Sequence, residues 1–177
     1  MFDKDLNITG KHGEYIRRIV DDFDTQKHKF FKAGYDAYKL AAIIGFLYGR
    51  KGEKSVSKEG EKPFTIFASQ LSNIQDDLMF NYRLIMLLDD NHEPVFNERI
   101  QKAFNYYGDE EKSKSDRELF ESYTLGGIEI LYEKLIFHAS KQEDYLSNLF
   151  DFIQDFNSYK LTDSQIEDIN LIELSRL

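Results

Sequence analysis

The residue types that most often carry out chemistry are few and scattered in this sequence. Cysteine is absent, which excludes thiolate metal sites and disulfides. None of the histidines is followed, three or four residues later, by a second ligand that would form a metal motif; they are His12, His28, His92 and His138. The phosphate-binding, dinucleotide-binding and nucleophile-elbow motifs of glycine-rich turns are also absent. We therefore expect no metal and no cofactor, and the sequence identifies no catalytic residue.

Two acidic clusters come closest to a metal or nuclease motif. His92 stands near Asp89, Asp90 and Glu93, which is a conceivable ligand set for a hard metal ion. Residues 110–112, Glu-Glu-Lys, resemble the end of a nuclease E-x-K motif, but no strand flanks them. Residues like those around His92 more often cap and solvate a helix end, which is the interpretation we favour there. Residues 110–112 belong to a charged, solvated loop.

Two cationic features are better candidates for binding. Arg83 is the only charged residue between Asp77 and Asp89 in a strongly apolar segment. A structural arginine in this position would reach the surface or pair with a buried carboxylate. The functional alternative is that Arg83 binds an anion. The 50–62 segment is locally basic, and its cations are Arg50, Lys51, Lys54, Lys58 and Lys62. Cations after a helix end are expected from the helix dipole alone; the alternative is contact with a phosphate or a partner.

The charge balance argues against DNA as a direct ligand. The net charge is −9, and residues 139–177 carry three cations against eight anions. Such a surface repels phosphates. The acidic residues keep the protein soluble, or they form a surface complementary to a basic partner, or they mimic DNA. The first residues lack the pattern of a signal peptide, and the longest apolar stretch, Leu40–Tyr48, is too short to span a membrane. We expect a cytoplasmic protein without membrane contact.

Apolar residues recur mostly every third or fourth position, which predicts helices. The expected helices cover 13–23, 33–50, 74–88, 95–107, 116–138, 142–158 and 163–175. A charged loop covers 51–63, and 64–67 is a short strand or an extended segment. Residues 74–88 are apolar almost all the way round, which predicts a central buried helix. We expect residues 1–177 to form a single all-α domain, a compact bundle of six or seven helices, with 139–177 as its acidic helical extension.

A pair of glycines interrupts the 116–138 segment. Gly126 and Gly127 fall on its apolar side, with Glu118, Glu129 and Glu133 opposite. Small residues also recur every fourth position in the 33–50 segment, at Ala33, Ala37, Ala41, Gly45 and Gly49. Small side chains let helix axes approach closely, so we predict that this ridge packs on the glycine pair. The packing occurs within the fold or across a homodimer; the other interpretation is a helix break at Leu125–Gly126.

Four segments occur in a recognisable order: YDAYKLAAIIGFLYGRKG (35–52), KPFTIFASQLSN (62–73), RLIMLLDDN (83–91) and RELFESYTLGGIEILYEKL (117–135). Together they resemble a family of small bacterial proteins encoded beside the Dnd genes of DNA phosphorothioation. In that family an apolar helix led by tyrosine ends in a glycine and basic residues, and an aromatic YxxGGxxxL helix comes last. The resemblance covers about 35–135 and rests on packing residues. It implies a role in phosphorothioate modification or the restriction linked to it, and transfers no catalytic residue.

Three functions follow as hypotheses. The first is a non-catalytic accessory or regulatory protein of such a phage-defence system, acting through protein–protein contacts. The second is a DNA-contacting module that uses the basic 50–62 loop. The third is a small enzyme with an anion site near Arg83. The missing catalytic motifs and the acidic surface favour the first.

Overall fold

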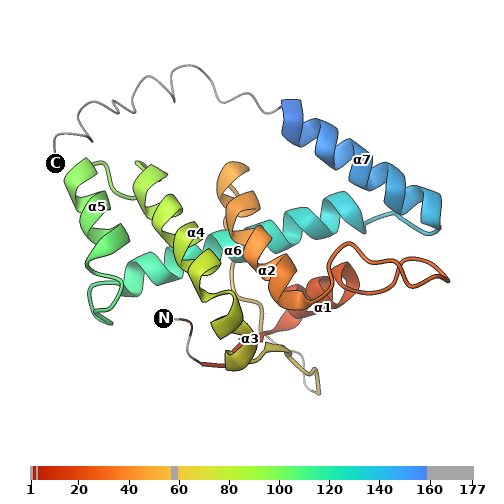
Figure 1. The fold of residues 1–177 in the computed structure, drawn as a ribbon, viewed down its shortest axis with the longest axis horizontal. Helices are drawn as coiled ribbons and strands as arrows, with labels where there is room; N and C mark the ends of the chain where they lie inside the picture. Colours follow the sequence, from red (N-terminus) through yellow and green to blue (C-terminus); the bar gives the residue numbers. More distant parts are fainter. Residues whose placement is uncertain (1, 3, 57–59, 159–177) are drawn as a thin grey trace.

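A long helix, α6 (Lys114–Leu135), runs through the middle of the fold, and most other helices pack against it (Figure 1). The computed structural model describes residues 2, 4–56 and 60–158. Twelve residues of α6 are buried, against six in α4 (Gln75–Leu88), where Phe80 is 64% exposed. The prediction that 74–88 is the central helix is therefore wrong. Packing from several directions, rather than apolar composition, makes α6 the central element.

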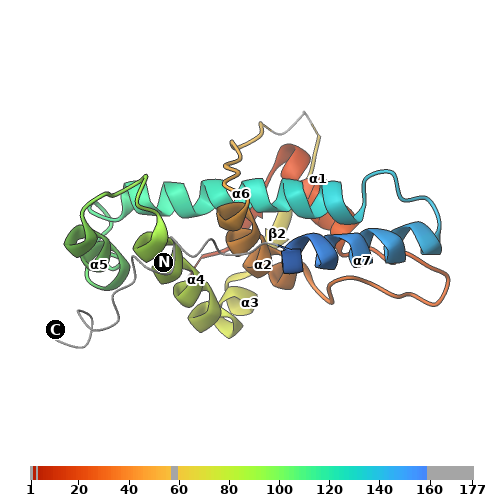
Figure 2. The same cartoon turned by 90° about the horizontal axis from the view of Figure 1, so that it is seen from above.

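The described part of the chain forms seven helices and one two-stranded sheet, which confirms the predicted all-α fold. Besides α4 and α6, the elements are β1 (Leu6–Ile8), α1 (Gly10–Ile19), α2 (Gly34–Leu47), β2 (Phe64–Ile66), α3 (Ala68–Asn73), α5 (Phe96–Phe104) and α7 (Gln142–Ser158). Figure 2 shows α2, α4 and α7 on one side of α6 and the segment that follows α2 on the other. The helix expected over 163–175 lies outside the described residues.

The small sheet joins two segments that are far apart in the sequence. β2 pairs antiparallel with β1, so that Leu6 lies opposite Ile66 and Ile8 opposite Phe64. The sequence predicted an extended segment at 64–67 but gave it no partner, because three residues are too few to show strand alternation. It also missed α3, a short helix that Ile74 separates from α4.

A glycine turn ends α2 three residues before its expected limit at 50. Gly49 has φ of +61°, a backbone conformation that suits glycine. The Gly49 N–H donates to the Phe46 carbonyl (3.0 Å), and the Arg50 N–H donates to the Gly45 carbonyl (2.9 Å). These two bonds form a Schellman motif, which closes the helix. Gly49 therefore terminates α2 and is not part of the predicted ridge of small residues, and Ala33 is the residue that precedes the helix.

The middle of α2 crosses α6 in backbone contact. A Cβ added to Gly127 would lie 1.8 Å from the Ala41 carbonyl oxygen, and one added to Gly45 would lie 1.8 Å from the Tyr123 carbonyl oxygen. Each helix thus presents a glycine to the backbone of the other, and Ala37 is buried at the same face of α2. α6 continues without a break through both glycines, so the interpretation of a break at Leu125–Gly126 is wrong.

Gly126 serves a different neighbour. A Cβ there would lie 2.0 Å from the Arg50 carbonyl oxygen, beyond the end of α2. The Gly52 N–H donates to the Ser122 carbonyl at 2.8 Å, which holds the same segment on α6. The two adjacent glycines therefore accept two different segments, one from α2 itself and one from the chain that follows it.

We predict that Gly127→Ala destabilises the protein although alanine favours helix. Helix propensity alone would stabilise the variant by about 1 kcal/mol, whereas forcing an atom into a tightly packed contact costs about 1–3 kcal/mol. The obstructing Ala41 carbonyl is backbone and cannot rotate away. Urea unfolding measures the difference. Gly108→Ala is the matched control, since no atom lies within 4 Å of its added Cβ. A Gly127→Ala variant more stable than wild type would contradict the observed contact.

Candidate functional site

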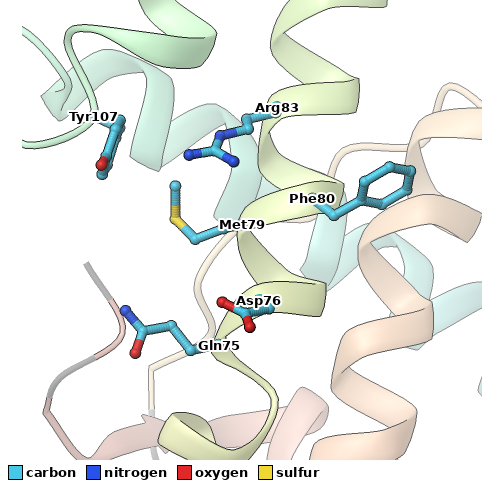
Figure 3. A pocket seen from close by; sticks show the side chains of 6 residues that line it. All are labelled: Gln75, Asp76, Met79, Phe80, Arg83 and Tyr107. Atoms are coloured by element: carbon cyan, nitrogen blue, oxygen red, sulfur yellow. The ribbon is translucent and has the colours of Figure 1, made fainter.

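A hollow with a charged lining lies between α4 and the segment after α5. Its volume is about 460 Å³, and five of its six lining residues come from successive turns of α4; the six are Gln75, Asp76, Met79, Phe80, Arg83 and Tyr107. In Figure 3, Arg83 and Tyr107 point toward one another, with Met79 beside them and Gln75 and Asp76 at the other end. The spacing of four residues places Gln75, Met79 and Arg83 in one row along α4, whereas Figure 3 shows the Phe80 ring turned away from Arg83.

Arg83 lies in this hollow between two aromatic rings. Its guanidinium carbon is 5.4 Å from the centre of the Phe104 ring and 5.6 Å from that of Tyr107. Its Nε is buried without a hydrogen-bond partner, and within the described residues the guanidinium forms no ion pair. Among the described residues, Arg83 is therefore not paired with a buried carboxylate, which was one of the alternatives expected from the sequence. A half-buried guanidinium held over aromatic faces can bind a carboxylate or another planar anion.

The basic segment after α2 uses its cations against α6. Arg50 Nη1 lies 2.6 Å from Glu133 Oε2, and Lys54 Nζ lies 2.8 Å from Glu121 Oε2. Lys51 Nζ lies 4.8 Å from the centre of the Tyr123 ring. Lys58 lies outside the described residues. Exposed pairs of this kind contribute about 0–1 kcal/mol each to stability, but together they neutralise charge that a phosphate contact would need.

The cluster around His92 ties the turn after α4 to α6. His92 Nε2 lies 2.9 Å from Asp116 Oδ1, and Lys102 Nζ lies 3.1 Å from the same oxygen. The Tyr123 hydroxyl donates to Asp89 Oδ2 at 2.7 Å. In the part of the chain that the structure describes, no group of three His, Asp or Glu side chains is arranged to hold a metal ion. The imidazole and carboxylates are instead joined in structural contacts.

Sequence reasoning missed a second polar site on α1. His12 is fully buried, and its Nε2 lies 2.9 Å from Glu129 Oε1, which also lies 2.8 Å from Lys11 Nζ. We expected Glu129 on the exposed side of α6, but α1 covers that side. His12 precedes Ile16 and Ile19 by four and seven residues, a spacing that does indicate a buried histidine. Nothing local indicates a partner 117 residues away.

The comparisons with known proteins return no relative. No family model, no curated protein and no solved structure matches the chain. The resemblance to the Dnd-associated family therefore stays a prediction. Among the described helices, none combines the length and apolar character that crossing a membrane requires.

We predict that acid weakens the fold through His12. Burial lowers the pKa of His12 from its usual 6.5, although the hydrogen bond to Glu129 acts in the opposite direction. As pH decreases, His12 therefore binds a proton in the unfolded chain before it does so in the folded protein. The free energy of unfolding falls as pH decreases below 6.5 toward the pKa of His12 in the folded protein. His12→Gln removes this proton and should flatten the decline.

Urea unfolding at neutral pH and at about pH 5.5, where an ordinary histidine is protonated, tests this prediction. His138→Gln is the control, because His138 is exposed on the turn after α6. An equal acid effect in wild type and His12→Gln would show that another group carries it.

Proposed function

We propose that this chain is an accessory or regulatory protein of a bacterial DNA phosphorothioate modification system, or of the restriction linked to it, and that it acts in that system by binding another protein. The resemblance over 35–135 supplies the biological system. The Arg83 hollow supplies the observation that favours binding, since it offers, on a partly apolar surface, a cation that forms no ion pair with any described residue.

The composition around Arg83 is typical of an interaction hot spot. Arginine and aromatic residues dominate the residues that carry binding energy at protein interfaces. Phe80 and Phe104 are 64% and 46% exposed, and Val95 and Phe96 are exposed at the start of α5. A carboxylate flanked by apolar side chains on the partner would fit this surface, because it would pair with Arg83 while covering the phenyl rings.

The DNA-contacting alternative has less support. Arg50 and Lys54 are already paired with carboxylates of α6, and the chain as a whole is acidic. DNA binding requires cations that can replace the counterions of phosphates. An enzyme at Arg83 also has little support, since among the described residues the hollow is lined by a single carboxylate, that of Asp76.

We predict that Arg83→Glu weakens binding to a purified component of the modification or restriction complex by at least about 30-fold, the effect of losing a hot-spot residue worth about 2 kcal/mol. Isothermal titration calorimetry against each component measures it. Arg18→Glu is the matched control, since Arg18 is exposed on α1 and does not line the hollow. Wild-type affinity in Arg83→Glu would overturn the role of the hollow.

A second measurement tests the biological system independently of Arg83. Iodine cleaves DNA at phosphorothioate linkages, so cleavage of genomic DNA reports modification, and phage plating reports restriction. Deletion of the gene should change one of the two, and the wild-type gene should restore it. If neither changes and no component binds the purified protein, the proposed function is wrong.

A further inference from the structure

Three polar side chains from distant parts of the chain form a hydrogen-bonded row: Ser55 from the segment that follows α2, His12 from α1 and Glu129 from α6. Ser55 Oγ lies 3.2 Å from His12 Nδ1, and His12 Nε2 lies 2.9 Å from Glu129 Oε1. The Thr9 hydroxyl donates to the Ser55 carbonyl at 2.8 Å. A Cβ added to Gly10 would lie 2.4 Å from Ser55 Cβ, so the two backbones are closely packed. Ser55 is thus held in place by contacts that do not use its hydroxyl.

The acidic end of the row determines its protonation. Burial lowers the pKa of His12; burial acts to raise the pKa of Glu129, but the hydrogen bonds from Lys11 and His12 lower it overall. Near neutral pH the Glu129 carboxylate can only accept a hydrogen bond, so His12 Nε2 carries the proton. Nδ1 of the neutral imidazole then has a free lone pair, which accepts the hydroxyl hydrogen of Ser55. A serine donating to an oriented neutral imidazole is an activated nucleophile.

Space for a small substrate exists beside the hydroxyl. A cavity of about 90 Å³ has Ser55 and His12 in its lining, together with Tyr38 and Thr124. This volume holds only a few water molecules, so the space beside Ser55 suits a short acyl group such as acetyl. The Thr9 side chain makes no capping hydrogen bond to the first turn of α1, and Gly10 at the start of that turn lies against Ser55. N–H groups at a helix start are suitable donors to an oxyanion.

We propose that Ser55 is a nucleophile, with His12 as its base and Glu129 as the positioning residue, for the hydrolysis of esters that carry a short acyl group. Ser55 Oγ attacks the carbonyl carbon while its proton passes to His12 Nδ1. The bond from the carbonyl carbon to the alkoxy oxygen breaks, and the alcohol leaves with that proton. Water then attacks the acyl-serine and gives a proton to His12. The serine oxygen leaves with it, so that one ester and one water yield one acid and one alcohol.

This activity goes beyond the proposed binding function and shares no residue with it. Arg83 lies on α4, whereas the row joins α1, the segment after α2 and α6. The two proposals therefore fail separately. A protein whose Ser55 is unreactive can still bind a partner through Arg83, and an Arg83→Glu variant should keep a reactive Ser55.

A fluorophosphonate ester is the probe, since it phosphonylates an activated serine with loss of fluoride. We expect one adduct per chain, located on Ser55 by peptide mass spectrometry, and none in Ser55→Ala. Ser122→Ala should label like wild type, because the Ser122 hydroxyl donates to the Leu119 carbonyl and faces no histidine partner. Glu129→Gln should slow labelling at least about tenfold, as loss of the orienting carboxylate slows serine triads far more. Equal labelling of wild type and Ser55→Ala, or no labelling of the folded wild type, would overturn the proposal.

A cysteine variant separates activation from folding defects. The chain contains no cysteine, so Ser55→Cys introduces a single thiol whose alkylation rate by iodoacetamide can be followed against pH. A thiol beside His12 should react at lower pH than the thiol of Ser72→Cys, which is exposed on α3, because a neighbouring imidazole promotes the thiolate. Adding Glu129→Gln should move the Ser55→Cys profile toward that of Ser72→Cys. Coincident profiles for Ser55→Cys and Ser72→Cys would show that His12 does not activate this position.

Discussion

The backbone contact between α2 and α6 is the constraint on which the rest of this fold depends. Gly127 and Gly45 each face a carbonyl oxygen of the other helix, so the axes come closer than ordinary side chains allow. The cost of glycine in a helix, about 1 kcal/mol for each residue, is offset by burial of α2 and α6 against each other. Ala41 and Ile128, both fully buried, lie on the two helices that meet here. A larger residue at the crossing would separate the helices and open the core on both sides.

The same approach determines where the chain goes after α2. The Schellman turn at Gly49 redirects the backbone at the point where Gly126 leaves room for the Arg50 carbonyl. The chain then follows α6 instead of entering solvent, held by the Gly52 N–H and by the ion pairs of Arg50 and Lys54. This path carries Ser55 to the start of α1. The sequence suggests an exposed basic loop after α2. In the structure, residues 50–55 of this loop are attached to the central helix, α6.

Several elements could be predicted from the sequence, and the reasons differ from one to the next. The 142–158 pattern predicted α7 to the residue, because one clean amphipathic stripe is local information. The small residues on α2 and the glycine pair were also readable, since both lie at helical spacing. β1 and α3 were not, because each is too short to show a period. The central role of 74–88 was inferred from composition, which reports how apolar a helix is and not how many neighbours cover it.

The site residues also differ in whether the local sequence indicates them. Arg83 could be singled out because a lone charge in an apolar segment is visible locally, whereas its setting between Phe104 and Tyr107 depends on how α5 and its following turn pack. The row from Ser55 to Glu129 has no local signature at all, since its hydrogen bonds join residues 43 and 117 positions apart. Such a site exists only once α1 and the segment after α2 both lie on α6. Because Gly126 and Gly127 let α2 and the segment after it lie on α6, two residues without side-chain functional groups position the hydrogen-bonded row of Ser55, His12 and Glu129.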